Sequence, residues 1–171
     1  LTMNKNYSHY LIVLLLLTAP FIYLFTFYSS LPDTIPTHFN IKGEADGFGS
    51  KNMAFFGPVF MGAISLFVYA IMINIKKIDP KRYEHNNDAY FKVFGLIIVA
   101  FMSAINMMIL TKTKQPNLPI DKLLLPLVGL LFAVMGWFFP KLSQNYYAGF
   151  KLPWTLANEE NWKATHNYAG K

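Results

Sequence analysis

The chain contains an uncharged apolar run, Tyr10 to Tyr28 (YLIVLLLLTAPFIYLFTFY), that is long enough to cross a lipid bilayer as one helix. A bilayer core of about 30 Å needs roughly 20 helical residues, and a run of about 18 residues with few charges indicates a spanning helix. Three further apolar segments, 53–75, 91–110 and 120–139, reach or approach this length. The sequence therefore predicts an all-α fold, a polytopic transmembrane helical bundle of four spans.

The composition supports the same class and excludes several others. The chain has 171 residues, of which 54% are hydrophobic and 14% are charged, whereas soluble domains carry about 25% charge. The absence of cysteine excludes disulfide scaffolds, thiolate zinc sites and cysteine nucleophiles. All but one of the fifteen basic residues are Lys, and nucleic-acid recognition relies largely on Arg. We therefore expect no direct contact with nucleic acid.

The distribution of Lys and Arg between the apolar segments predicts the orientation. With the N-terminus in the cytoplasm, 10 basic residues lie inside and 5 lie outside. The positive-inside rule selects this arrangement. We therefore expect a multi-pass protein of the bacterial cytoplasmic membrane with both termini cytoplasmic. Segment 29–52 would then be an exterior loop, and segment 140–171 would be cytoplasmic.

A few polar or helix-breaking residues interrupt the apolar segments. Pro20 should kink the first span, and its missing N–H must be compensated by neighbouring groups. Asn74 and Asn106 are the strongest polar intrusions, and we expect each to bond a neighbouring helix. Transport pathways require ionisable groups near the bilayer midplane, and the four spans carry none there. The pattern argues against a transporter or ion pump that works through these spans alone.

Small and aromatic residues predict how the spans pack and where they end. Small residues four apart allow close approach of helices. They occur at Gly129 and Ala133, with Gly136 on the same side, and at Ala100 and Ala104. Aromatic residues near span ends are typical of an interfacial belt. The belt is predicted at Tyr10, Tyr28, Phe55, Phe56, Phe91, Trp137 and Phe138.

The exterior loop reads LPDTIPTHFNIKGEADGFGSK from Leu31 to Lys51. Segment 34–40 suits a short strand, and segments 40–43 and 46–47 have the composition of turns. We expect a small hairpin or Ω-like loop in which Phe39 and Phe48 pack on the membrane-proximal surface.

Three side chains of this loop bear on metal binding. His38, Glu44 and Asp46 are potential metal ligands, but no fourth ligand is evident and no helix fixes their spacing. We therefore expect no metal here, and no cofactor elsewhere in the chain. The alternatives that remain are a compact structural loop and a surface that recognises something outside the cell.

The cytoplasmic tail reads PKLSQNYYAGFKLPWTLANEENWKATHNYAG from Pro140 to Gly170. Thr155 can cap a helix that begins near Leu156. Glu159 and Glu160 would lie near the positive end of its dipole, and Glu159 would pair with Lys163 at i, i+4.

The same helix has one stripe that carries Glu159, Trp162, His166 and Ala169, so the indole and imidazole rings should share a face. A structural helix at the membrane interface, with Trp154 and Trp162 buried, is one interpretation. A docking surface for a cytoplasmic partner is the other. Glu160 and His166 leave a membrane enzyme as a third alternative, although no nucleophile, phosphate loop or metal partner accompanies them.

Both segments resemble a known group. The exterior loop resembles that of the small domain of unknown function at the N-terminus of SdpI-like proteins. The tail GFKLPWTLANEENWKATHNYAGK resembles the SdpI motif, which usually shows Pro-Trp-Thr, Asn-Glu-Glu-Asn-Trp and Thr-His. These three groups match at residues 153–155, 158–162 and 165–166. Residues 151–152, Lys-Leu, depart from an expected Arg-Thr pair.

The resemblance implies a bacterial membrane protein of the toxin-immunity type, which is not an enzyme. Such a protein resists a secreted, membrane-active peptide toxin and captures a cytoplasmic repressor at the membrane. The residues that would face the toxin are Pro36, His38, Phe39, Asn40, Gly43, Asp46 and Lys51. Those that would face the repressor are Trp154, Thr155, Asn158, Glu159, Glu160, Trp162 and His166.

The resemblance also suggests a division of the chain. Residues 1–75 would form the N-terminal domain, with the exterior loop at 29–52. Residues 76–171 would form the SdpI-like part, with the motif at 140–171. Family members usually continue into two more spans after the Thr-His pair, so we expect this part to lack them.

An accessory subunit of a larger membrane complex is the main alternative role. Membrane lipid is an expected partner, and association of the chain into a homo-oligomer is a further alternative.

Overall fold

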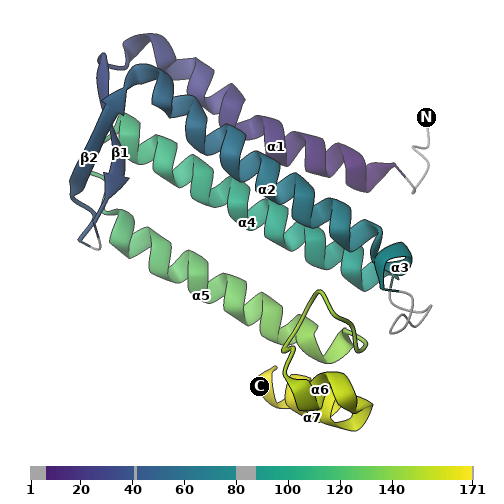
Figure 1. Cartoon of the computed structure of the whole chain (residues 1–171). Coiled ribbons are helices and arrows are strands. Elements are labelled where there is room, and N and C mark those ends of the chain that lie inside the picture. The colour runs from purple at the N-terminus through teal and green to yellow at the C-terminus, as the bar shows by residue number, and fades with distance from the viewer. Residues whose placement is uncertain (1–6, 41, 80–87, 171) are drawn as a thin grey trace. The chain divides into compact units, whose positions relative to one another are not determined.

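The computed structural model describes residues 7–40, 42–79 and 88–170 (Figure 1). Within them, four helical segments are long and apolar enough to cross a membrane: Ser8–Ser30, Lys51–Ile73, Ala89–Lys114 and Lys122–Lys141. This confirms the prediction of four spans by length and composition. The basic residues Lys5, Lys81, Arg82 and Lys171, which contribute to the predicted orientation, lie outside the described residues.

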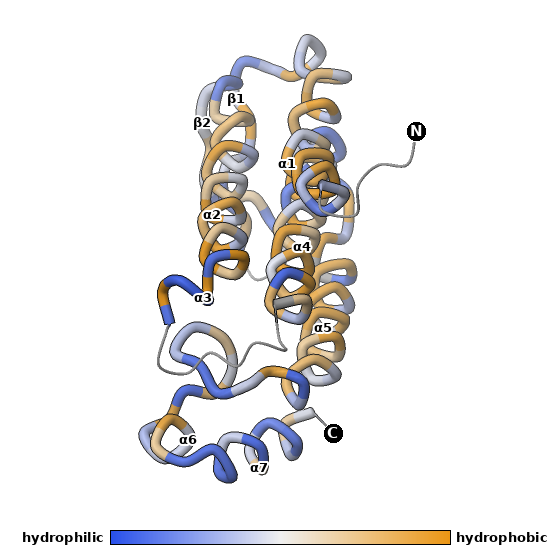
Figure 2. The backbone as a smooth tube through the Cα atoms, turned by 90° about the vertical axis from the view of Figure 1, so that its right-hand side faces the viewer, coloured by the Kyte–Doolittle hydropathy of each residue, from blue (hydrophilic) through white to orange (hydrophobic). Residues whose placement is uncertain are grey.

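The spans are made of four long helices with short helical extensions. Helix α1 (Ser8–Phe27) continues into η1 (Tyr28–Ser30), and η2 (Lys51–Phe55) leads into α2 (Phe56–Ile73). Helix α4 (Asp88–Lys114) is longer than the predicted span at both ends. Helix α5 (Ile120–Phe138) continues into η4 (Phe139–Lys141). Apolar residues dominate all four long helices, as the colouring in Figure 2 shows.

The remaining elements are short. Strands β1 (Thr34–Phe39) and β2 (Ala45–Ser50) form an antiparallel hairpin between α1 and α2. Helix α3 (Ile75–Ile78) follows α2, and helices α6 (Pro153–Ala157) and α7 (Glu159–Ala169) form the tail. The predicted hairpin is therefore present, and its exterior position stays a prediction.

The chain divides into two compact units, and each is built from two separate stretches. Unit 1 comprises Leu1–Leu66 and Val99–Leu127, and unit 2 comprises Phe67–Ile98 and Val128–Lys171. Unit 1 therefore includes the hairpin, and unit 2 includes the tail. The predicted domain boundary after residue 75 stays a prediction.

Unit 1 has a core that anchors the hairpin to the ends of the helices. The core residues come from α1, β1, η2, α4 and the η1–β1 connection: Leu24, Phe27, Leu31, Ile35, Ala54 and Leu110. Ile35 is 2% exposed although it belongs to a two-stranded hairpin. Burying it fixes the register of β1, because a one-residue slip would move its side chain to the other face.

A hydroxyl group compensates for the proline in α1. Pro20 lacks the N–H that would bond the carbonyl oxygen of Leu16, four residues earlier. The Ser103 hydroxyl of α4 donates to this same carbonyl oxygen at 2.7 Å. The predicted compensation by a neighbouring group is confirmed.

The two asparagines within the apolar segments behave differently. The amide of Asn106 in α4 donates to the carbonyl oxygen of Gly57 in α2 at 3.2 Å, as predicted. The amide of Asn74 instead donates to Ala70, in the last turn of α2. The prediction of a neighbouring helix is wrong for Asn74, because this residue lies where α2 ends and α3 begins.

Unit 2 has a core that brings the tail against the helices. Its buried members are Met72, Ile75, Phe91, Phe94, Phe138, Leu142 and Ala148. Two predicted belt residues, Phe91 and Phe138, are therefore core residues, 1% and 3% exposed. Trp137, at 63% exposed, keeps the character of a belt residue. Trp137 and Phe138 differ in exposure because adjacent helical residues point in different directions.

The small residues of α5 also have different surroundings. A side chain at Gly136 would meet the backbone of Ala169 and Gly170 at 3.6 and 3.7 Å. Gly136 therefore accommodates the end of α7 rather than another span. A side chain at Gly129 would meet nothing within 4 Å. The predicted helix interface at Gly129 and Ala133 stays a prediction.

Candidate recognition segments

One asparagine forms the turn of the hairpin. The side-chain oxygen of Asn40 accepts the N–H groups of Lys42 and Glu44 at 2.9 and 3.0 Å. Gly43 has φ +75°, a conformation that favours glycine. The carbonyl oxygen of Asn40 accepts the Gly43 N–H at 2.8 Å. The predicted turn at residues 40–43 is confirmed.

The second predicted turn, at Asp46 and Gly47, is wrong. Both residues belong to β2, and Gly47 pairs with His38 of β1 beside an irregularity in the ladder. A side chain at Gly47 would come within 2.9 Å of the His38 Cβ. Gly47 lets the two strands approach closely. Close approach of another backbone is a common reason for a Gly inside a strand.

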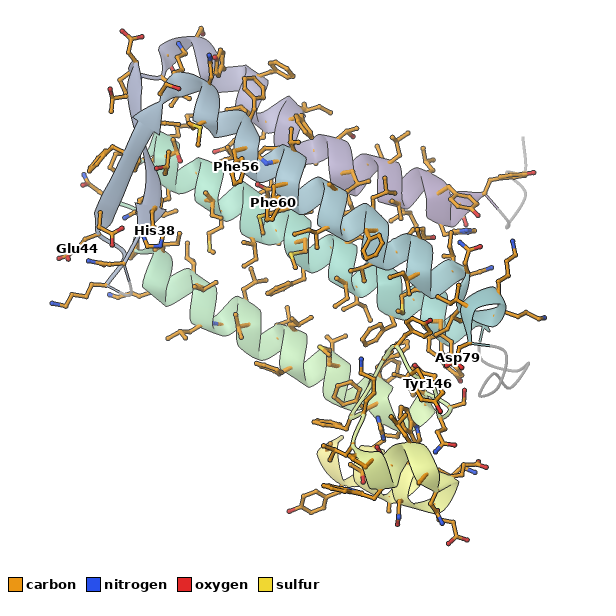
Figure 3. All side chains as sticks on the ribbon, viewed as in Figure 1. His38, Glu44, Phe56, Phe60, Asp79 and Tyr146 are labelled. Atoms are coloured by element: carbon orange, nitrogen blue, oxygen red, sulfur yellow. The ribbon has the colours of Figure 1, made fainter. Side chains whose placement is uncertain are left out.

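The polar side chains of the hairpin pair with one another; Figure 3 labels two of them, His38 and Glu44. His38 Nδ1 and Asp46 Oδ1 form a hydrogen bond, and Asn40 donates to the Glu44 carboxylate at 2.9 Å. Glu44 thus has a partner other than His38. Within the described ranges, no group of three His, Cys, Asp or Glu side chains could hold a metal ion.

The aromatic and basic residues of the hairpin have distinct positions. Phe39 is half-buried, and the Lys112 ammonium lies 5.7 Å from its ring centre. Phe48 is 64% exposed, so the chain itself does not cover it. Lys51 donates to the Ser29 carbonyl oxygen and lies over the Tyr28 ring.

The seven predicted toxin-facing residues fall into two sets by exposure. His38 and Asp46 are exposed. The others are half-buried: Pro36, Phe39, Asn40, Gly43 and Lys51. The hairpin thus holds its polar side chains at the surface through backbone pairing and one turn. Contact with a toxin stays a prediction.

The tail has two short helices where one was predicted. Helix α6 begins at Pro153, and Thr155 lies inside it with no exposed surface. The Thr155 hydroxyl accepts the N–H of Leu152 at 2.9 Å and donates to the carbonyl oxygen of Phe150 at 2.7 Å. The prediction that Thr155 caps a helix near Leu156 is wrong, because Pro153 already fits the first position of a helix.

Asn158 caps the second helix. Its side-chain oxygen accepts the N–H groups of Glu160 and Asn161 at 2.7 and 3.1 Å. Glu159 and Glu160 lie in the first turn of α7, and Glu159 pairs with Lys163. These placements confirm the predicted dipole and i, i+4 interactions. Asn is as good an N-cap as Ser or Thr, so the sequence alone could have identified it.

Trp162 and His166 share one face of α7, as predicted. Their rings stack with centres 4.0 Å apart, and both residues are 1% exposed. The Trp162 indole N–H donates to the carbonyl oxygen of Leu142 at 2.8 Å. The pair therefore connects α7 to the chain that leaves α5.

His166 is held as a neutral ring. Its Nε2 accepts the Phe150 N–H at 3.0 Å, so this nitrogen carries no proton. Its Nδ1 lies 2.8 Å from the Trp162 carbonyl oxygen and donates to it. Burial lowers the pKa of the His166 imidazole from its ordinary value of 6.5, against the opposing effect of the Trp162 carbonyl. Both ring nitrogens are therefore engaged in holding the tail.

Several residues outside the predicted recognition set also hold the tail together. Gly149 has φ +107°, and a side chain there would overlap the His166 Nε2 atom. The Asn145 side-chain oxygen accepts the N–H groups of Tyr147 and Ala148 at 2.8 and 2.6 Å. The Asp79 carboxylate, 3% exposed, accepts the Tyr146 N–H at 2.8 Å (Figure 3). Turn-forming Gly and Asn are recognisable in a sequence, but a partner 67 residues away is not.

The seven predicted repressor-facing residues also divide by exposure. Thr155, Trp162 and His166 are buried. The other four are exposed: Trp154, Asn158, Glu159 and Glu160. The chain itself buries Trp162 but leaves Trp154 56% exposed, so burial of Trp154 at the membrane interface stays a prediction. The buried three maintain the tail, and the exposed four are those available to a partner.

The fold defines a class, a multi-pass helical membrane protein with a small hairpin between its first two spans. Residues 15–62 match the family model described as domain of unknown function DUF1648, and residues 141–171 match that of the SdpI/YfhL protein family. No curated protein and no solved structure matches the chain. The two matches agree with the resemblance to SdpI-like proteins that carry a domain of unknown function on their N-terminal side. At the level of the family, the SdpI match supports a membrane protein of the immunity type.

Proposed function

We propose that this protein gives its bacterial host resistance to a secreted, membrane-active peptide, and that it does so by binding rather than by catalysis. The observation that carries the proposal is the pair of family matches on two segments with ordered polar side chains. The first match covers α1 from Leu15 onward, the hairpin and the start of α2, and the second covers the tail.

The proposal places the two segments on opposite sides of the bacterial cytoplasmic membrane. The hairpin follows one candidate span and the tail follows four, so three crossings separate them. The excess of Lys and Arg assigns the tail to the cytoplasm. The peptide would therefore meet the hairpin side, where His38 and Asp46 are exposed.

In the proposed mechanism, a captured peptide cannot assemble the lesion that depolarises the cell. Binding on the hairpin side can also change the tail. This requires that the peptide bind more tightly to the protein when the tail has one of two conformations. The tail would then present its exposed residues to a cytoplasmic repressor. Trp154, Glu159 and Glu160 offer an aromatic ring and two carboxylates for that contact.

A challenge experiment tests the protective function. The full chain is expressed in a sensitive strain, and a potential-sensitive dye follows the membrane during exposure to the secreted peptide. Protected cells should keep their potential while cells with an empty vector depolarise. Unchanged depolarisation at normal membrane expression would contradict the proposal. A double variant, Trp154→Ala with Glu160→Ala, should keep protection and lose repressor capture.

An accessory subunit of a larger membrane complex is the second candidate. The observation that favours it is the uncovered side of α5, where Gly129 has nothing within 4 Å and Leu125 and Phe132 are 73% and 66% exposed. Small residues on an open helix face allow another helix to approach. Purification in mild detergent without any peptide distinguishes the roles, because a stoichiometric membrane partner would support the subunit.

A further inference from the structure

Unit 1 contains an apolar groove of about 420 Å³ beneath the hairpin. Its walls come from four elements: β1, η2, the first turns of α2 and the last turns of α4. The volume falls in the range of pockets that bind small molecules, about 300–1,000 Å³. The proposed function does not use this groove.

The groove is lined by neutral side chains. Its walls include Pro36, Met61, Ile109 and Leu110, and none of the described residues that line it is Asp, Glu, Lys, Arg or His. A charged ligand placed here would lose its hydration without a counter-ion, which is strongly unfavourable. The occupant should therefore be neutral.

One side of the groove is open to the outside of the helical bundle. Phe56 and Phe60 of α2 line it, and their rings stack with centres 5.4 Å apart (Figure 3). They are 58% and 52% exposed and lie within a candidate span. Lipid therefore surrounds these rings when α2 crosses the membrane. A ligand dissolved in the bilayer can enter from the side.

The polar atoms of the groove indicate what the ligand carries. Asn106 is 3% exposed, its amide nitrogen donates to Gly57, and its side-chain oxygen is buried with no hydrogen-bond partner. Buried acceptors are normally paired. Once the Asn106 side chain turns its oxygen toward the groove, a ligand hydroxyl would supply the missing donor, whereas a carboxylate or a pure hydrocarbon would not.

We propose that this groove binds a neutral, single-chain amphiphile with one hydroxyl group, a long-chain alcohol or a lipid with the same chemistry. The hydroxyl would bond the Asn106 side-chain oxygen, and the chain would lie along Phe56, Phe60 and Ile109. The occupant would connect the hairpin, through Pro36, to the two spans below it.

Photolabelling in phosphatidylcholine nanodiscs tests this inference on the full chain. The probe is hexadecanol with a diazirine in its chain, and mass spectrometry locates the attached label. Label should concentrate on residues 53–61 and 106–113. Excess unlabelled hexadecanol should reduce it at least tenfold, and ionised palmitate should not. Equal competition by palmitate would overturn the neutral class.

Variants make the test independent of general lipid contact. Ile109→Trp fills the groove and should lower labelling about tenfold, while Leu66→Trp on the exposed side of α2 should leave it unchanged. Should Ile109→Trp fail to fold, Ala54→Leu narrows the same groove. The variant Asn106→Leu should be labelled by the hexadecanol probe no more strongly than by a diazirine-bearing hexadecane. Label spread over Leu14 and Phe132 in proportion to their exposure would overturn the proposal, as would equal labelling of the two Trp variants.

Discussion

The candidate recognition residues are at least partly exposed in the hairpin, whereas several of them are buried in the tail. In the hairpin, backbone pairing and the Asn40 turn leave His38 and Asp46 at the surface. In the tail, Thr155, Trp162 and His166 are interior residues that hold a compact segment together. Matching residues in a motif can therefore be a contact surface in one segment and a small core in another. Substitutions separate these two uses.

The largest effect is expected at Gly149. A Gly149→Ala change forces a side chain into the His166 ring at a positive φ, which should cost about 3 kcal/mol of tail stability. Faster proteolysis within residues 142–170 would report this loss. Gly129→Ala is the matched control, because nothing lies within 4 Å of that position. Equal proteolysis of the two variants would contradict the structure of the tail.

The two tryptophans of the tail provide the next comparison. Trp162→Phe leaves the buried Leu142 carbonyl oxygen without its 2.8 Å donor, at a cost of about 1–3 kcal/mol. Trp154→Phe changes an exposed ring and should alter stability by less than about 0.5 kcal/mol. Thermal denaturation in detergent, followed by the fluorescence of the remaining tryptophans, measures both. If Trp154→Phe proves the more damaging, the exposure pattern is wrong.

Acid should loosen the tail through His166. Burial lowers the pKa of its imidazole in the folded tail, so the folded state prefers the neutral ring. This stabilisation is fully present above pH 6.5, the ordinary value, and is lost as pH falls through the lower folded pKa.

Tryptophan fluorescence between pH 8 and pH 4 measures this transition. The variant His166→Gln should abolish the acid-dependent part, whereas His38→Gln in the hairpin should retain it. A transition that survives in His166→Gln would assign the acid sensitivity to another group.

The smallest effect on stability is expected in the hairpin. His38→Ala removes an exposed side chain and its bond to Asp46, which should cost no more than about 0.5 kcal/mol. On the proposed function, it should nevertheless weaken protection against the peptide in the membrane-potential assay. Thr37→Ala, an exposed neighbour on β1, is the control. Full protection by His38→Ala would remove this residue from the toxin-facing set.

The sequence predicts the spans well because membrane crossing depends on length and apolarity alone. The Glu159–Lys163 pair, the Asn40 turn and the Trp162–His166 face are also predictable, since each depends on residues close in the chain. Pairings such as Ser103 with Leu16 and Asp79 with Tyr146 are not, because they depend on which helices meet. The same reason explains why sequence patterns do not distinguish buried Trp162 from exposed Trp154.

The bond from Ser103 to Leu16 restricts how unit 1 can move. The Leu16 carbonyl has lost its own helical donor to Pro20, and in hydrocarbon no water can replace Ser103. Sliding α1 by one turn, about 5.4 Å, would strand that oxygen. A piston-like stroke of the first span against α4 is therefore disfavoured. Any message carried through these two helices must be a rotation or a tilt about this fixed point.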